Sequence, residues 1–128
     1  MRLCKVVLIG LLAIAANTPV LAQAELLIPR SRVENANYYL LTMVIKGDVV
    51  AASHKRVSPL SVGYTKTETN CKTMKMIALG YSEASLSAIK IKRTKWFDLV
   101  DGSSKSDLAN FVCAIKAVQS AGDKPKGI

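Results

Sequence analysis

The most concentrated chemistry in the sequence is a run of basic residues followed by two aromatic ones. Four cations stand within six positions and form a candidate binding patch: Lys90, Lys92, Arg93 and Lys95. Trp96 and Phe97 follow directly. Cations at this density attract acidic partners and speed association with polyanions. The alternative interpretation is structural, since lysines on a solvent-facing strand discourage edge-to-edge pairing between sheets.

Signs of catalysis are sparse. The chain holds one histidine, His54, which we expect to be a surface or half-buried polar residue in a strand. The sequence contains no zinc-site spacing, no glycine-rich phosphate loop and no Gly-x-Ser-x-Gly turn. Its nine Asp and Glu residues are scattered, without a pair suited to acid–base hydrolysis. We therefore predict a protein that is not an enzyme and that uses no metal or cofactor.

Residues 1–24 have the three-part pattern of a secretory signal. Arg2 and Lys5 precede an unbroken run of 11 apolar residues and glycine, followed by a polar stop and small residues that suit signal-peptidase cleavage. The favoured cut follows Ala24, and a cut after Ala22 is the alternative. The apolar run is too short for a membrane-spanning helix, which needs about 20 residues. We expect an extracytoplasmic protein, periplasmic, secreted or at the cell surface, without a transmembrane span after cleavage.

Cleavage after residue 24 would change both the charge and the cysteine count. It removes two of the 18 Lys and Arg residues, so that 16 stand against nine Asp and Glu, a net charge of +7 on 104 residues. Of three cysteines, Cys4 is lost and two remain. An even number in a small exported chain predicts one disulfide, Cys71–Cys113. Closing that loop contributes about 4 kcal/mol in the chain-entropy model. A redox-active pair is disfavoured because the spacing is far from Cys-x-x-Cys.

The length predicts one domain, in which strands precede a single helix. Residues 25–37 are polar and are expected to form an N-terminal leader or edge segment. Alternating patterns and β-branched residues predict four strands. These strands are expected at 38–45, 49–57, 64–79 and 88–97. The first has a nearly continuous apolar run, so we expect it to be covered on both faces.

The last predicted element is a helix with a capping box at its start. Ser104 is expected to accept a hydrogen bond from the backbone N–H of Asp107, whose side chain reaches back. Apolar residues at helical spacing should face the sheet: Leu108, Phe111, Val112, Ile115 and Val118. Cys113 lies beside this stripe, where it can reach Cys71 on the longest predicted strand. A flexible tail is expected over 120–128.

Three stretches, taken in order, resemble the surface-adhesin protein E-like family of small exported bacterial proteins. They are residues 45–50, 69–76 and 96–103, the last leading to Phe111-Val112-Cys113. The resemblance covers roughly residues 38–116. It implies an α+β fold, with a single antiparallel β-sheet, a C-terminal helix packed on it and the Cys71–Cys113 disulfide locking the two. The name-giving adhesin binds host matrix and serum glycoproteins. It is a lipoprotein, whereas this sequence has no acylation cysteine at its predicted cleavage site.

We therefore predict an exported, non-enzymatic binding module resembling surface adhesin E, with its domain at 38–119. Its basic strand would dock an acidic host or envelope partner, either a protein or an anionic polysaccharide. Nucleic acid is chemically possible but is not expected outside the cytoplasm. Two alternatives stay open. One is a periplasmic structural or accessory protein, and the other is a small inhibitor of a secreted hydrolase that uses a loop at 80–87.

Overall fold

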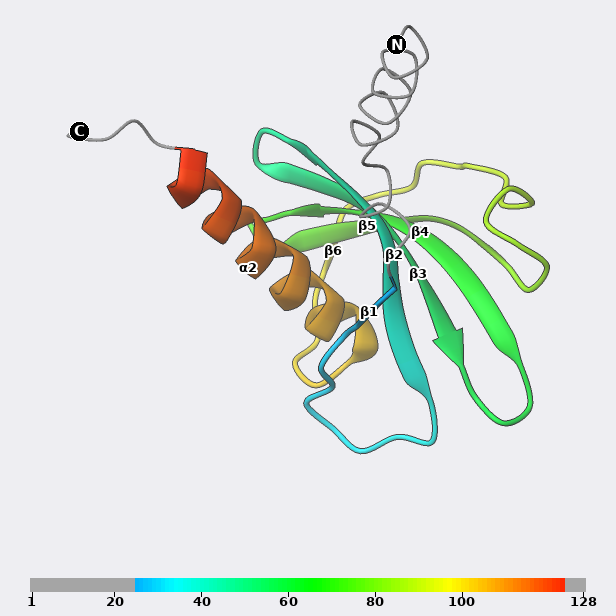
Figure 1. Cartoon of the computed structure of the whole chain (residues 1–128). Coiled ribbons are helices and arrows are strands. Elements are labelled where there is room, and N and C mark those ends of the chain that lie inside the picture. The colour runs from blue at the N-terminus through cyan, green and yellow to red at the C-terminus, as the bar shows by residue number, and fades with distance from the viewer. Residues whose placement is uncertain (1–24, 124–128) are drawn as a thin grey trace, which may run out of the picture.

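The computed structural model describes residues 25–123, which form one antiparallel sheet crossed on one face by a helix (Figure 1). The strands follow one another across the sheet in chain order: β1 (Leu26–Leu27), β2 (Asn37–Lys46), β3 (Val49–Val57), β4 (Val62–Asn70), β5 (Lys75–Ser82) and β6 (Phe97–Asp98). The helix is α2 (Ser104–Asp123). The predicted α+β fold is confirmed.

Two of the predicted segments fall wholly or partly outside this description. The signal peptide predicted at 1–24 lies outside the described residues, and so does the end of the predicted tail, 124–128. The first part of that tail, 120–123, is helical and belongs to α2. No helix within the described residues is long and apolar enough to cross a membrane.

β2 is not covered on both faces, although its apolar run is nearly continuous. Two pairs of its side chains pack into the core: Tyr38 and Leu40, then Met43 and Ile45. A bulge at Leu41 separates the pairs and reverses which residues face the helix. Val44 points away from the core and is 56% exposed. Before the bulge the even-numbered side chains face the core, and after it the odd-numbered ones do. The apolar run is continuous because it covers both halves of one buried face. The expectation of two covered faces is therefore wrong.

The longest predicted strand is in fact two strands joined by a tight turn. The side-chain oxygen of Asn70 accepts hydrogen bonds from the backbone N–H groups of Lys72 and Thr73, at 2.8 and 3.0 Å. Met74 then adopts a left-handed conformation with φ of 57°. This side-chain-capped turn is typical of asparagine. It overrides the strand propensity of the surrounding threonines, so the prediction of one strand over 64–79 is wrong.

The predicted strand over 88–97 is also wrong for most of its length, since only its last residue belongs to β6. Upstream, the backbone N–H of Lys92 donates to the carbonyl of Leu79 at 2.8 Å, without a continuous ladder. The segment passes close to β5 because Gly80 has no side chain. A Cβ at Gly80 would lie 2.5 Å from Cγ2 of the buried Ile89 and 2.9 Å from a backbone carbonyl oxygen.

The main core lies between α2 and the sheet. Its most buried helical side chains are Leu108, Ala109 and Val112, which face the strand residues Leu40, Val50 and Met76. Phe111 and Ile115 are partly buried against this core. Val118, predicted to complete the stripe, is 72% exposed. The apolar contact of the helix therefore ends near Ile115, although the helix itself continues to Asp123.

The N-cap of α2 is Ser103, one residue before the predicted Ser104. The hydroxyl of Ser103 accepts a hydrogen bond from the backbone N–H of Ser106 at 3.1 Å. The backbone N–H of Asp107 donates to the carbonyl of Ser103 at 3.0 Å. The side chain of Asp107 does not reach back to the cap, because it binds the N-terminal segment instead.

The predicted disulfide Cys71–Cys113 is present, with its two Cα atoms 5.6 Å apart. Cys71 lies directly after β4, in the turn rather than within a strand. Its backbone N–H donates to the carbonyl of Asp48, in the turn between β2 and β3, at 2.8 Å. The disulfide thus fastens α2 to the end of the sheet where two hairpin turns meet.

Removal of the disulfide is expected to lower the free energy of unfolding by about 4 kcal/mol, because the unfolded chain regains the entropy of an open loop. Urea unfolding of the Cys71→Ala/Cys113→Ala double variant would measure this loss. Lys72→Ala, on the same exposed turn, is the control and should change stability by less than about 0.5 kcal/mol. A double variant as stable as the control would contradict the prediction.

Candidate functional site

A cleft of about 340 Å³ opens between β4, β5, the start of α2 and the basic segment, residues 90–95. Its polar and aromatic lining consists of Thr65, Tyr81, Lys90, Lys92, Thr94 and Lys105. Three lysines from two distant parts of the chain therefore line one cleft. None of its lining residues within the described part of the chain carries a carboxylate. We call this site the cationic cleft.

The structure divides the four residues of the predicted binding patch. Lys90 and Lys92 line the cationic cleft, whereas Arg93 and Lys95 do not. Side chains alternate along an extended backbone, so neighbours point to opposite sides. The guanidinium of Arg93 binds the carboxylate of Glu68 at 3.0 Å, on the face of the sheet away from α2. The patch is therefore not one surface, and it does not lie on a regular strand.

Lys105 is the member of the site that the sequence reasoning missed. It lies in the first turn of α2, where the helix dipole disfavours a positive charge by about 0.3–1 kcal/mol. Ion pairs within residues 25–123 involve other cations and none of the three cleft lysines. A cation in this unfavourable position is the sequence signal that points to Lys105.

Tyr81 provides an aromatic surface in the cleft and is 59% exposed. The outer end of its ring rests on Gly63, where a Cβ would lie 2.4 Å from the tyrosine hydroxyl oxygen. That hydroxyl also donates a hydrogen bond to Glu83 at 3.3 Å. Gly63 and Glu83 thus fix the ring in place, while more than half of its surface stays open to solvent.

His54 lies behind the cleft and does not line it. It pairs with the cleft residue Thr65 across β3 and β4, and it is only 7% exposed, so the expectation of a surface or half-buried residue is wrong. Its Nδ1 atom is buried without a hydrogen-bond partner. Burial lowers the pKa of His54 to about 4, and the charge of Lys105 acts in the same direction. His54 is therefore neutral at pH 7 and adds no charge to the cleft.

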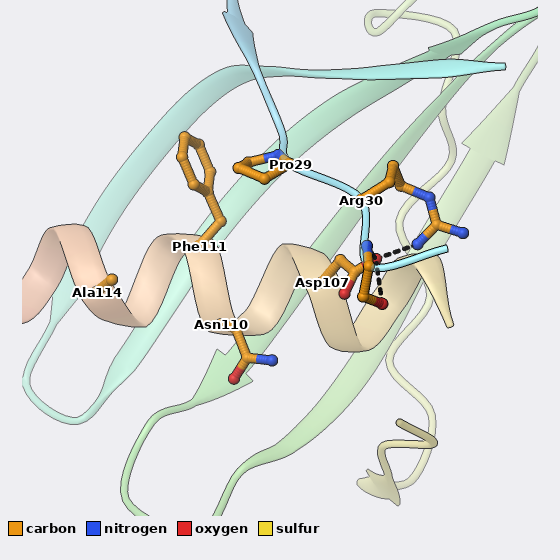
Figure 2. A pocket seen from close by; sticks show the side chains of 7 residues that line it. Pro29, Arg30, Asp107, Asn110, Phe111 and Ala114 are labelled. Atoms are coloured by element: carbon orange, nitrogen blue, oxygen red, sulfur yellow. Dashed lines mark hydrogen bonds and ion pairs between the residues drawn. The ribbon is translucent and has the colours of Figure 1, made fainter. Parts of the chain in front are cut away.

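A second cleft, of about 370 Å³, lies between the N-terminal segment and α2 (Figure 2). Pro29 and Phe111 line its apolar part. At its polar end, the Asp107 carboxylate accepts hydrogen bonds from Arg30 and from the backbone and hydroxyl of Ser31. These charged groups already satisfy one another. The second cleft therefore offers a charged ligand much less than the cationic cleft does.

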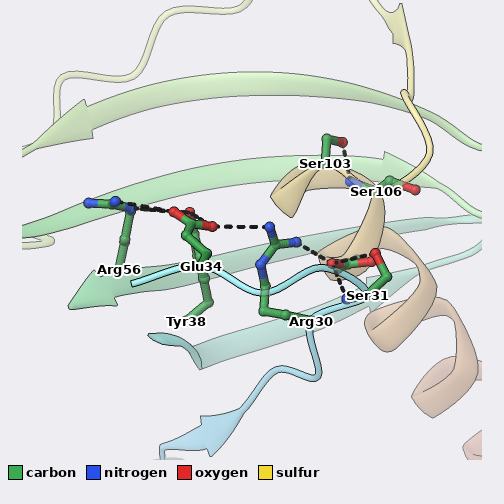
Figure 3. A network of polar contacts seen from close by, with 8 residues as sticks. Arg30, Ser31, Glu34, Tyr38, Arg56, Ser103 and Ser106 are labelled. Carbon is green, nitrogen blue, oxygen red and sulfur yellow. Dashed lines mark hydrogen bonds and ion pairs between the residues drawn. The ribbon is translucent and has the colours of Figure 1, made fainter. Parts of the chain in front are cut away.

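The same arginine starts a network that ties the N-terminal segment to the sheet (Figure 3). Glu34 bridges Arg30 and Arg56, with N–O distances of 3.0 and 3.1 Å. Burial acts to raise the pKa of both Glu34 and Asp107, but their hydrogen bonds and the nearby arginine charge outweigh it, so that both pKa values lie below their usual range. Both carboxylates are therefore ionised at pH 7.

Comparison of the chain with known proteins finds no matching family, curated protein or solved structure. The resemblance to the adhesin E-like family therefore stays a prediction. Within the described residues, no group of three or more His, Cys, Asp or Glu side chains could hold a metal ion. The cationic cleft is the candidate site on its own geometry.

Acidification is expected to destabilise the protein between pH 6.5 and 4.5 through His54. An unfolded histidine takes up its proton near pH 6.5, whereas the folded protein accepts it only near pH 4. The unfolded state therefore binds more protons in this window, and stability falls by about 2.5 kcal/mol by pH 4.5. Glu34 and Asp107 have ordinary pKa values of 4.5 and 3.8, so they act at lower pH.

Urea unfolding at pH 7.0 and pH 4.5 measures this loss, and His54→Leu is the matched variant because it removes the titrating group. Its stability should change little between the two pH values. Equal losses in the parent protein and in His54→Leu would place the acid-sensitive group elsewhere.

Proposed function

We propose that this protein is an exported, non-enzymatic binding module that docks an acidic partner through the cationic cleft. The observation that supports this best is the convergence of Lys90, Lys92 and Lys105 on one cleft without a carboxylate in its lining. Like charges repel when they are brought together, so this arrangement is more favourable when an anion lies between them. The positive end of the α2 dipole strengthens the same field.

The types of residue that line the cleft favour a binding role. Its hydroxyl groups belong to Thr65, Thr94 and Tyr81. A nucleophile needs a base within hydrogen-bond reach. The one histidine of the chain is buried, neutral and outside the lining. Among the described residues, the lining holds no histidine, cysteine or carboxylate, so we assign the cleft the role of attracting and orienting an anion.

The extracytoplasmic location is part of the proposal and rests on the sequence. The pattern of charge, apolar run and small residues in 1–24 supports export. The disulfide between Cys71 and Cys113 supports it independently, since such bonds persist mainly in oxidising compartments. The three stretches that resemble the adhesin E-like family favour a role at the cell surface.

Loss of the cleft lysines is expected to weaken binding to a polyanion. Heparin is a suitable probe, at 0.15 M salt, with protein produced from the full chain and recovered after export. The triple variant Lys90→Gln/Lys92→Gln/Lys105→Gln should lose affinity by about tenfold or more, because three charge contacts disappear. Higher salt should weaken binding of the parent protein, since exposed charges are screened.

The matched control removes three lysines at the opposite end of the sheet: Lys46→Gln/Lys72→Gln/Lys75→Gln. It has the same net charge as the cleft variant, and it should keep most of the parent affinity. If both variants lose affinity equally, binding follows net charge alone and the cleft is not the site.

Export is tested by cell fractionation with N-terminal sequencing. The chain is expected in the periplasm, in the medium or on the cell surface, starting at Glu25, or at Gln23 if the alternative cut is used. A precursor that keeps Met1 and stays in the cytoplasm would contradict the proposal. Protease treatment of intact cells then separates a surface protein, which is degraded, from a periplasmic one, which is protected.

A further inference from the structure

We propose that the acidic partner is a polysaccharide and that the cationic cleft binds one sulfated or carboxylated sugar unit of it. This inference rests on the function proposed above and adds the ligand class. It depends on features of the cleft other than its charge, namely its aromatic surface, its hydroxyl groups and its size.

The aromatic surface favours a sugar ring over a bare anion. One face of a pyranose ring carries mainly C–H groups, which pack on the face of an aromatic side chain. Tyr81 lines the cleft and is 59% exposed, and its hydroxyl end is held by Gly63 and Glu83, so the ring is available for such packing. A simple phosphate or sulfate ion has no apolar surface and would gain nothing from this ring.

The hydroxyl groups of the lining favour a ligand that is itself rich in hydroxyls. Thr65, from β4, and Thr94, from the basic segment, both line the cleft. A threonine hydroxyl donates one hydrogen bond and accepts others, and a sugar hydroxyl does the same. Lys90, Lys92 and Lys105 donate only, so they suit the sulfate or carboxylate of the same unit.

The size of the cleft favours one sugar unit over a protein partner. Its volume of about 340 Å³ lies at the low end of ligand pockets, which span roughly 300–1,000 Å³. A stable protein–protein interface involves about 20–30 residues on each partner, whereas nine residues line this cleft. A polymer can insert one unit here and continue along the surface on either side.

The probes that test this inference separate the two parts of the ligand: one carries both the sulfate group and the sugar ring, one only the ring and one only the sulfate. They are N-acetylglucosamine 6-sulfate, N-acetylglucosamine and inorganic sulfate, titrated into the exported protein and followed by the backbone amide NMR signals of Tyr81 and Thr94. The sulfated sugar should bind roughly tenfold more tightly than either the uncharged sugar or sulfate. Tyr81→Ala should remove most of that advantage and leave the weak affinity for sulfate unchanged.

Two tyrosine variants serve as controls. Tyr81→Phe keeps the ring and loses the contact with Glu83, so it should retain most of the affinity for the sulfated sugar. Tyr39→Ala removes a ring on the opposite face of the sheet and should have no effect. Because Tyr81 is exposed, its variants should fold, and their urea unfolding curves check this.

Two further outcomes overturn the inference and leave the proposed function intact, and a third overturns both. If sulfate binds as tightly as the sulfated sugar, or if Tyr81→Ala changes nothing, the cleft is an anion site without sugar selectivity. If polyglutamate or a single-stranded oligonucleotide of equal charge displaces heparin as well as a sulfated oligosaccharide does, the partner is not a polysaccharide. If the cleft lysine variant binds heparin like the parent protein, both proposals fail.

Discussion

The antiparallel sheet has to bury one of its faces, and α2 is the element that covers the main core. The helix is held in three ways along its length. Its first turn is bound through Asp107 to Arg30 and Ser31, its middle packs with Leu108 and Val112 fully buried, and Cys113 links it covalently to the sheet. Since Lys105 belongs to the first turn, the same contacts that hold the core also fix the backbone from which the third lysine of the cationic cleft extends.

The positive charges of the protein differ in whether a carboxylate lies beside them. Arg30 and Arg56 share Glu34, Arg30 also binds Asp107, and Arg93 binds Glu68, so the guanidinium groups in these pairs are neutralised locally. The lysines of the cationic cleft have no such partner within residues 25–123. A net charge by itself suggests weak attraction to any polyanion. A local excess beside an aromatic ring and two hydroxyls instead suggests a site with selectivity.

The sequence predicted the features that depend on counting and on period, and it missed those that depend on single residues or on distant contacts. An even cysteine count predicted the disulfide, and a 3.6-residue period predicted the helix. The inserted residue Leu41 reversed which side chains of β2 face the core, and the turn formed by Asn70 divided one predicted strand into two. A single residue can have this effect because it outweighs the average strand propensity of the residues around it. The cleft joins Lys92 to Lys105 through space, and no local pattern contains that contact.

Several residues around the cationic cleft are poor choices for stability alone. Gly63 and Gly80 lie within strands, where glycine weakens the sheet. Lys105 places a cation at the positive end of a helix, and Lys90 and Lys92 add two more charges of the same sign. Each of these residues contributes to the cleft. Gly63 leaves room for the ring of Tyr81, and Gly80 allows the basic segment to approach β5. The three lysines together give the cleft a positive potential. Departures from local stability rules tend to gather where a protein acts. Their concentration at one cleft is therefore an argument for function there that does not depend on net charge.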